Sequence, residues 1–166
     1  MASLTLIIGG ARSGKTRYAE GLIKALPSPW IYVATAEVWD QEMHARVERH
    51  KTDRSEQGWL TIEAPLDLAS ALSTNRPVLV DCLTMWVTNL MLGEHDIEAA
   101  VGRLEATLAK RTAPTFLVAN EVGLGIVPDN KMARDFRDHA GRLNQILTQK
   151  ADRVILIVAG LPLSIK

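Results

Sequence analysis

The sequence is short of cysteine, of net charge and of long apolar runs, and each shortage excludes a class of protein. Its single cysteine, Cys82, excludes an intrachain disulfide and a cysteine-rich zinc site. The 19 basic and 19 acidic side chains cancel, so no overall field favours nucleic acid or an anionic membrane. We therefore expect no nucleic-acid partner. The lone thiol is compatible with a reducing cytoplasm, where we expect the protein to be located.

No apolar run is long enough to cross a bilayer. The longest, Val154–Ile165, falls short of a membrane span and contains Gly160 and Pro162. No basic segment precedes the first apolar run, so we expect neither a signal peptide nor a transmembrane segment. The chain has 166 residues, 47% hydrophobic and 23% charged, which is typical of one globular domain with a substantial core. We predict a single domain over residues 1–166.

Predicted strands alternate with predicted helices along the chain. Apolar runs rich in Val, Ile and Leu predict strands at Leu4–Ile8, Trp30–Thr35, Leu60–Glu63, Pro77–Asp81, Thr115–Ala119 and Arg153–Ala159. Helical patterns occupy Thr16–Leu26, Asp40–Asp53, Pro65–Ser73, Thr84–Leu92, Asp96–Arg111 and Asn130–Lys150. We expect Pro65 in the first turn of its helix. The alternation predicts an α/β fold, with a mostly parallel sheet covered by helices on both faces.

A phosphate-binding loop follows the first predicted strand. It has the pattern G-x-x-x-x-G-K-[ST], as Gly9-Gly10-Ala11-Arg12-Ser13-Gly14-Lys15-Thr16. Backbone N–H groups of such a loop surround phosphates, helped by the dipole of the following helix. Lys15 is positioned to reach the β- and γ-phosphates, and the Thr16 hydroxyl to bind Mg²⁺. The strand, loop and helix together predict a nucleoside triphosphate site.

Two acidic residues at the ends of later strands are candidates for roles beside the nucleotide. Asp81 ends an apolar strand, where P-loop proteins commonly place an aspartate next to Mg²⁺. The alternative is that Asp81 only caps the next turn. Glu121 lies in the loop 120–128 (NEVGLGIVP), which contains glycines and a proline. It is a candidate to hold the metal or to accept a hydroxyl proton, and a solvated surface carboxylate is the alternative.

His50 is the candidate nucleophile, with an alternative structural role. In a helix, Met43, Val47 and His50 share one face, which is more typical of a partly buried histidine than of a catalyst. Cations lie near it in the sequence: Arg46, Arg49, Lys51 and Arg54. They would neutralise a triphosphate and a leaving pyrophosphate, and would favour a neutral imidazole. A solvated basic helix face is the alternative explanation for these cations.

Several segments in order along the chain carry a resemblance to one family. They are GGARSGKTRYAE, YVATA, the DQEM segment before His50, DCLT, NEVGLGIVP, the spaced residues Asp138, Gly141, Arg142, Asn144 and Gln145, and AGLPL. Together they resemble the bifunctional adenosylcobinamide kinase/adenosylcobinamide-phosphate guanylyltransferase family of cobalamin biosynthesis. The resemblance covers essentially the whole chain. It implies a single-domain P-loop NTPase fold of the RecA-like type.

The resemblance implies chemistry in two stages. A kinase stage transfers the γ-phosphoryl group of ATP or GTP to the hydroxyl of adenosylcobinamide. A second stage moves GMP from GTP onto a histidine, with loss of pyrophosphate, and then onto adenosylcobinamide phosphate to give adenosylcobinamide-GDP. His50 matches the guanylylated histidine. Mg²⁺ is the expected cofactor, with Thr16 and Asp81 as its ligands, and the family implies a homotrimer.

The resemblance also places further residues at the nucleotide. Beyond the phosphate loop, the positions that match family contacts to GTP are Ala34, Thr35, Ala36, Lys51, Thr52, Asp53, Arg54, Glu63 and Asp81. The segment around Glu63 is poorly constrained, so its match is weaker than that of Asp81. Relatives with a second histidine would have it at the position of Arg49, so His50 has no competing neighbour here.

Two other functions are alternatives for a chain with this phosphate loop. A GTPase switch would need D-x-x-G and N-K-x-D motifs, but the sequence has DCLT at 81–84 and NKMA at 130–133. That function is disfavoured. A P-loop small-molecule kinase or RecA-like ATPase without nucleotidyl transfer would need only the phosphate loop and Asp81. It predicts that His50 is dispensable.

Overall fold

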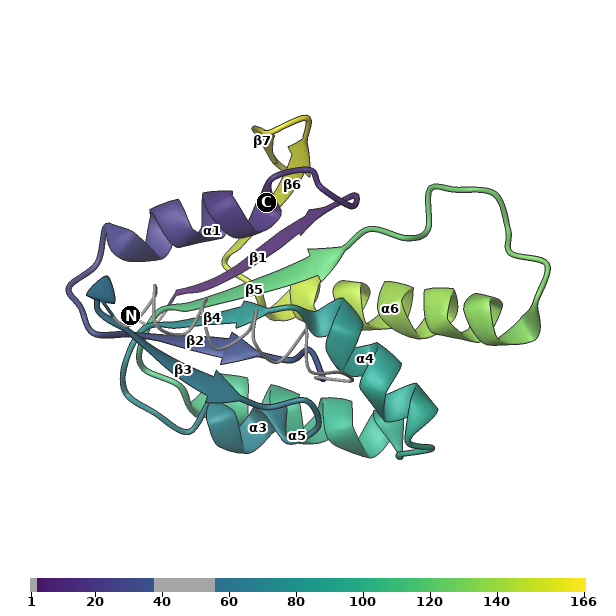
Figure 1. Ribbon diagram of the computed structural model, residues 1–166, viewed down its shortest axis with the longest axis horizontal. Coiled ribbons are helices and arrows are strands. Elements are labelled where there is room, and N and C mark those ends of the chain that lie inside the picture. The colour runs from purple at the N-terminus through teal and green to yellow at the C-terminus, as the bar shows by residue number, and fades with distance from the viewer. Residues whose placement is uncertain (1–2, 38–55) are drawn as a thin grey trace.

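A single sheet organises the protein, for which a computed structural model describes residues 3–37 and 56–166 (Figure 1). The sheet has seven strands in the order β3-β2-β4-β5-β1-β6-β7. Their bounds are β1 Leu4–Gly9, β2 Trp30–Ala34, β3 Trp59–Glu63, β4 Val78–Asp81, β5 Thr115–Asn120, β6 Arg153–Val158 and β7 Leu161–Ser164. All pairings are parallel except that of β6 with β7. The predicted α/β fold with a mostly parallel sheet is confirmed.

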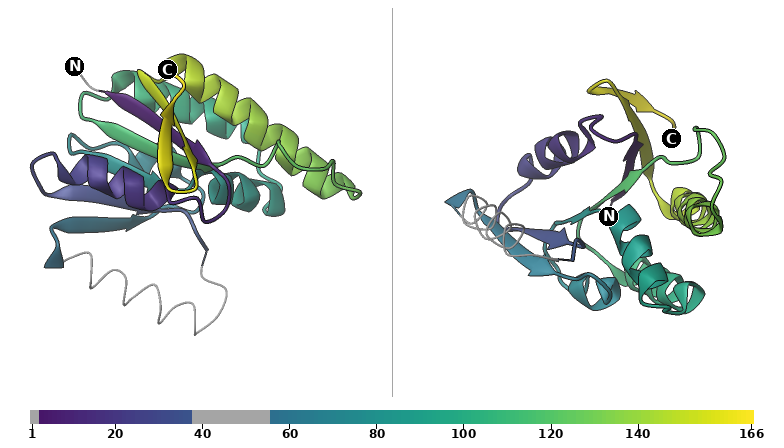
Figure 2. Two further views of the ribbon diagram at one scale, coloured as in Figure 1. Left: turned by 90° about the horizontal axis from the view of Figure 1, so that it is seen from above. Right: turned by 45° about the vertical axis from the view of Figure 1, so that its right-hand side comes forward.

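Helices cover both faces of the sheet, as predicted. Their bounds are α1 Lys15–Lys24, α3 Leu68–Ala71, α4 Leu83–Leu92, α5 Ile97–Lys110 and α6 Lys131–Lys150. Of the described helices, Figure 2 shows α1 on one face and the others on the opposite face. Successive residues of a strand point to opposite faces. Leu6 of β1 therefore packs in the larger core cluster with α4, α5 and α6, and Ile7 packs in the smaller cluster with α1.

Side-chain caps fix where several helices begin. Asn130 accepts a hydrogen bond from Ala133 N at 2.8 Å and starts α6 at the predicted place. Asp67 accepts one from Ser70 N at 3.2 Å and starts α3. A helix lies within the predicted range 65–73, but the prediction of Pro65 in its first turn is wrong, because the cap lies after the proline. None of the helices in the described part of the chain is long and apolar enough to cross a membrane.

The last strand, β7, was not predicted. Ala159 and Gly160 have positive φ values of 51° and 82° and form the tight turn that joins β6 to β7. Pro162 lies in β7, at the edge of the sheet, where its missing N–H does little harm. Gly160 N donates to Ser13 O at 2.9 Å, so this turn supports the phosphate loop.

Parallel pairing brings the carboxyl ends of the first six strands to one edge of the sheet. Gly9 at the end of β1 lies opposite Asn120 of β5, and Ala34 of β2 lies opposite Asp81 of β4. One strand, β5, separates the phosphate loop from Asp81. This edge is where ligands of open α/β sheets bind. The expectation that the loop after β5 shares this edge with the phosphate loop is confirmed, because Glu121 N donates to Gly9 O at 2.9 Å.

Candidate functional site

Two glycines of the phosphate loop are dictated by geometry. At Gly9, a Cβ atom would lie 2.5 Å from the carbonyl oxygen of Ile157, so no larger residue fits without moving the backbone. Gly14 caps α1 with φ of 96°, a left-handed conformation that costs glycine little. Tyr18 N donates to Gly14 O at 3.0 Å, which continues the helix from the loop. The sequence thus folds here into a strand, a tight loop and the exposed N-terminus of a helix.

Lys15 is buried at this helix start, and its ammonium group has one hydrogen-bond partner among the described residues. The side chain is 7% exposed. Its Nζ donates to Gly10 O at 2.6 Å. Burial lowers the pKa of Lys15, while the nearby Cys82 and Asp81 act in the opposite direction. An ammonium group has three donors, so phosphate oxygens would satisfy what the loop leaves over.

The hydroxyl of Ser13 is a second polar group without a partner in the described part of the chain. Its Oγ is buried and has no hydrogen bond within residues 3–37 and 56–166. A buried hydroxyl without a partner costs about 1–3 kcal/mol. A phosphate oxygen in the loop would accept this hydrogen bond, and the orphaned group therefore fits a phosphate ligand.

Thr16 and Asp81, the two predicted ligands of Mg²⁺, lie within hydrogen-bond distance of each other. Thr16 Oγ1, in the first turn of α1, donates to Oδ2 of Asp81 at the end of β4 at 3.0 Å. Tyr32 OH donates to the same Oδ2 at 2.7 Å and fixes the carboxylate. Mg²⁺ prefers oxygen ligands and takes its remaining positions from water and substrate phosphates. A hydroxyl and a carboxylate side by side at a phosphate loop fit that ion. The described residues contain no cluster of three or more His, Cys, Asp or Glu side chains that could bind a metal on its own.

The predicted contacts at 34–36 lie at the end of β2, beside Asp81. Thr35 is fully buried. Its Oγ1 donates to Cys82 O at 2.7 Å and accepts from Cys82 N at 2.8 Å. Asn89 Nδ2 donates to Thr35 O at 2.7 Å. The Thr35 side chain therefore ties β2 to β4, while Ala34 and Ala36 on either side of it are half-buried. The nucleotide contacts of these three residues stay predictions.

The remaining predicted contacts are only partly described. Glu63 ends β3, is exposed, and lies opposite Ala34 in the sheet register. It therefore shares the carboxyl edge, but β2 separates its strand from β4. Several predicted site residues lie outside the described part of the chain: His50, Lys51, Thr52, Asp53 and Arg54. Their roles stay predictions.

The carboxylate of Glu121 has a local partner that the sequence did not reveal. It accepts a hydrogen bond from Gly123 N. A Cβ on Gly123 would lie 2.9 Å from Glu121 Oε1, so a glycine suits this position. Arg137 of α6 donates to Gly123 O and holds the loop from the other side. Glu121 therefore shapes its own loop, and the predicted metal or proton role stays untested.

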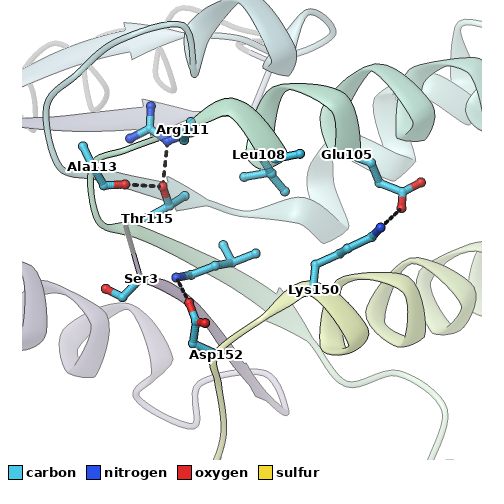
Figure 3. Close-up of a pocket in the computed structure, with 10 residues that line it drawn as sticks. Ser3, Glu105, Leu108, Arg111, Ala113, Thr115, Lys150 and Asp152 are labelled. Carbon is cyan, nitrogen blue, oxygen red and sulfur yellow. Dashed lines mark hydrogen bonds and ion pairs between the residues drawn. The ribbon is translucent and has the colours of Figure 1, made fainter. Parts of the chain in front are cut away.

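A cavity lies at the other end of the strands, away from the phosphate loop (Figure 3). It has a volume of about 250 Å³ and includes the starts of β1 and β5. Its charged groups are paired within the protein. Lys150 lies 3.5 Å from Glu105, and Asp152 accepts a hydrogen bond from Leu4 N at 2.8 Å. Because its charged groups already have partners, this cavity is a weaker candidate for a ligand than the phosphate loop.

Comparisons with known proteins agree with this geometry. The sequence model of the family described as cobinamide kinase / cobinamide phosphate guanyltransferase matches residues 5–165. The bifunctional adenosylcobalamin biosynthesis protein CobU of Salmonella typhimurium is 43% identical over 182 residues, covering 98% of this chain and 99% of the relative. CobU of Escherichia coli K12 is 41% identical with the same coverage. CobP of Pseudomonas aeruginosa, with the same descriptive name, is 42% identical over 168 residues, covering 97% and 96%.

Proposed function

Because this chain belongs to the cobinamide kinase / cobinamide phosphate guanyltransferase family, we propose that it performs both reactions at one nucleotide site. It phosphorylates adenosylcobinamide with ATP or GTP and then transfers GMP from GTP to the phosphorylated product. The observation that carries the proposal is the intact phosphate loop, with Lys15, Thr16 and Asp81 gathered at one sheet edge, in a chain that the family matches over residues 5–165.

The kinase step needs positioning more than covalent chemistry. The substrate hydroxyl oxygen attacks the γ-phosphorus in line, the bond to the β–γ bridging oxygen breaks, and the hydroxyl proton leaves to solvent. Lys15 and the loop N–H groups hold the β- and γ-phosphates, and Ser13 supplies a further donor. When bound to Thr16 and Asp81, Mg²⁺ supplies charge neutralisation at these oxygens.

The transferase stage splits one displacement into two. A ring nitrogen of His50 attacks the α-phosphorus of GTP, and the bond to the β-phosphate breaks to release pyrophosphate. An oxygen of adenosylcobinamide phosphate then attacks the same phosphorus, the P–N bond breaks, and the imidazole is regenerated. The residues 38–55 that contain His50 connect the end of β2 to the start of β3. The family resemblance of the DQEM segment and His50 supports the assignment.

Labelling with GTP tests the covalent stage directly. The protein is mixed with Mg²⁺ and GTP labelled on the α-phosphate, denatured, and assayed for bound label. We expect label that is acid-labile, alkali-stable and absent from His50→Ala, which keeps at least part of its kinase turnover. A protein that binds GTP but takes up no label would instead be a P-loop small-molecule kinase or ATPase.

Two finer features are also proposed. We propose a homotrimer, as the family resemblance implies; the exposed apolar side chains of the edge strand β7, Leu161 and Leu163, support self-association. Sedimentation equilibrium should give a trimer for the parent and a smaller species for Leu161→Asp. A monomeric parent would refute the proposed trimer.

We propose a cytoplasmic location because both reactions consume nucleoside triphosphates.

A further inference from the structure

A groove beside α6 brings together two segments that the nucleotide site does not use. It has a volume of about 520 Å³ and lies between the loop after β5 and the outer side of α6. Its lining residues are Glu121, Val122, Gly123, Gly141, Asn144, Gln145, Thr148 and Gln149. The first three belong to NEVGLGIVP, and the next three belong to the spaced residues 138–145. Segments about twenty positions apart in the sequence thus form one surface.

The lining of this groove is rich in carboxamides and poor in charge. Asn144, Gln145 and Gln149 carry carboxamide side chains, and Thr148 adds a hydroxyl. A carboxamide donates and accepts at once, so it pairs well with another carboxamide. Glu121 is the one lining residue with an ionisable side chain, and its carboxylate is engaged by Gly123 N. The groove therefore suits a ligand that carries many amides.

A helix-interior glycine keeps the groove open. Gly141 lies within α6, where glycine is a poor helix former. A Cβ at this position would meet no atom within 4 Å, so nothing in the fold excludes a larger side chain. Gly141 nevertheless lines the groove. A bulky residue here would fill space that the fold leaves free.

Apolar side chains continue from the groove along the same loop. Leu124 is 87% exposed and Ile126 is 97% exposed, directly after the lining residue Gly123. Large apolar side chains exposed together commonly mark a binding surface. A carboxamide lining, with exposed apolar side chains directly after it in the loop, matches an amphipathic macrocycle whose rim bears amides.

We propose that this groove holds the corrin ring of the substrate, an inference that rests on the function proposed above. The corrin of adenosylcobinamide is an apolar macrocycle with carboxamide arms. Its amides pair with Asn144, Gln145 and Gln149, and its apolar face meets the loop. The groove adjoins the phosphate loop through Glu121 N, which donates to Gly9 O at 2.9 Å. The hydroxyl arm extends past Glu121 toward the phosphates.

Filling the groove tests the inference. Gly141→Phe is compared with Gly102→Phe, which adds the same side chain at another exposed helix-interior glycine with nothing within 4 Å of its Cβ. Binding of adenosylcobinamide is measured by equilibrium dialysis and visible absorbance, and GTP binding is measured in parallel. We expect Gly141→Phe to weaken corrinoid binding by about tenfold or more and Gly102→Phe to leave it unchanged. GTP binding should survive in both variants.

A second pair of variants removes the amides without adding bulk. Gln145→Ala with Gln149→Ala should weaken corrinoid binding by about tenfold. The matched control is Asn75→Ala, an exposed carboxamide outside the groove. Unchanged corrinoid affinity in both groove variants, or a parent that does not bind adenosylcobinamide, overturns the inference. These dialysis results do not depend on histidine labelling, so loss of the label alone refutes the transferase and leaves the groove standing.

Discussion

Lys15 and Arg111 are cations at opposite edges of one sheet, and burial lowers the pKa of both. They differ in what surrounds them. Lys15 donates to the carbonyl of Gly10, a residue that is itself exposed. Arg111 donates through Nε to Thr115 Oγ1 at 2.7 Å. Its terminal nitrogens donate to the carbonyls of Leu72, Thr74 and Arg76.

The difference shows what separates a buried cation that can bind a ligand from one that holds the fold together. A guanidinium whose donors are met by fixed carbonyls has little left for a ligand, and it joins the segment 72–76 to the start of β5. Among the described residues, the Lys15 ammonium has donors to spare beside the orphaned Ser13 hydroxyl, so a bound phosphate would give both groups further hydrogen bonds. Both cations are buried, so burial does not distinguish them. Lys15 differs from Arg111 in the hydrogen-bond donors that the described residues leave without an acceptor.

The largest expected effect comes from Lys15→Met, which keeps the volume and removes the charge. We expect kcat/KM of both reactions to fall by about 10²–10³, as for loss of one preorganised donor to a developing charge. The unfolding free energy should not fall, because the carbonyl of Gly10 regains water and a buried charge is removed. Steady-state kinetics and urea unfolding measure the two quantities. A variant that is inactive and also markedly less stable would contradict the contrast with Arg111.

Arg111→Met should show the reverse pattern. It leaves the buried carbonyl of Leu72 and the hydroxyl of Thr115 without their donor. We expect the unfolding free energy to fall by about 2–4 kcal/mol, from urea midpoints. The KM for GTP of the folded fraction should equal that of the parent. A raised KM for GTP without loss of stability would show that Arg111 affects nucleotide binding. The contrast between a structural Arg111 and a ligand-binding Lys15 would then fail.

Local sequence patterns predicted much of this molecule. The phosphate loop is a contiguous pattern between a strand and a helix, so its place follows from a few neighbouring residues. Alternating apolar runs gave strands whose parallel pairing then puts Asp81 beside Thr16. The fold and that contact were therefore predictable before any coordinates.

Other features depend on contacts between distant segments, and the sequence did not reveal them. β7 was missed because Pro162 and an unbroken apolar run hide the turn at Ala159 and Gly160. The Thr35 side chain binds the backbone of Cys82, a contact that no pattern near either residue records. The groove beside α6 has the same origin, because its two walls come from separate segments.

The smallest expected effect is a difference between Lys15 and Arg111 in how the unfolding free energy depends on pH. The pKa of Lys15 in the folded protein is below its usual 10.5, so in the alkaline range just below 10.5 the unfolded chain binds more protons. Stability from this group therefore rises with pH across that window, and Lys15→Met should lack the rise. Arg111 contributes no such slope, because a guanidinium does not lose its proton in proteins. Urea midpoints of the parent and Lys15→Met, measured from neutral pH upward, give the difference in pH dependence.

Bound GTP should abolish the rise in stability with pH, because phosphate stabilises the charged ammonium and returns the pKa of Lys15 toward or above its ordinary value. Parallel curves for the two proteins without nucleotide would mean that Lys15 is as well solvated as any surface lysine.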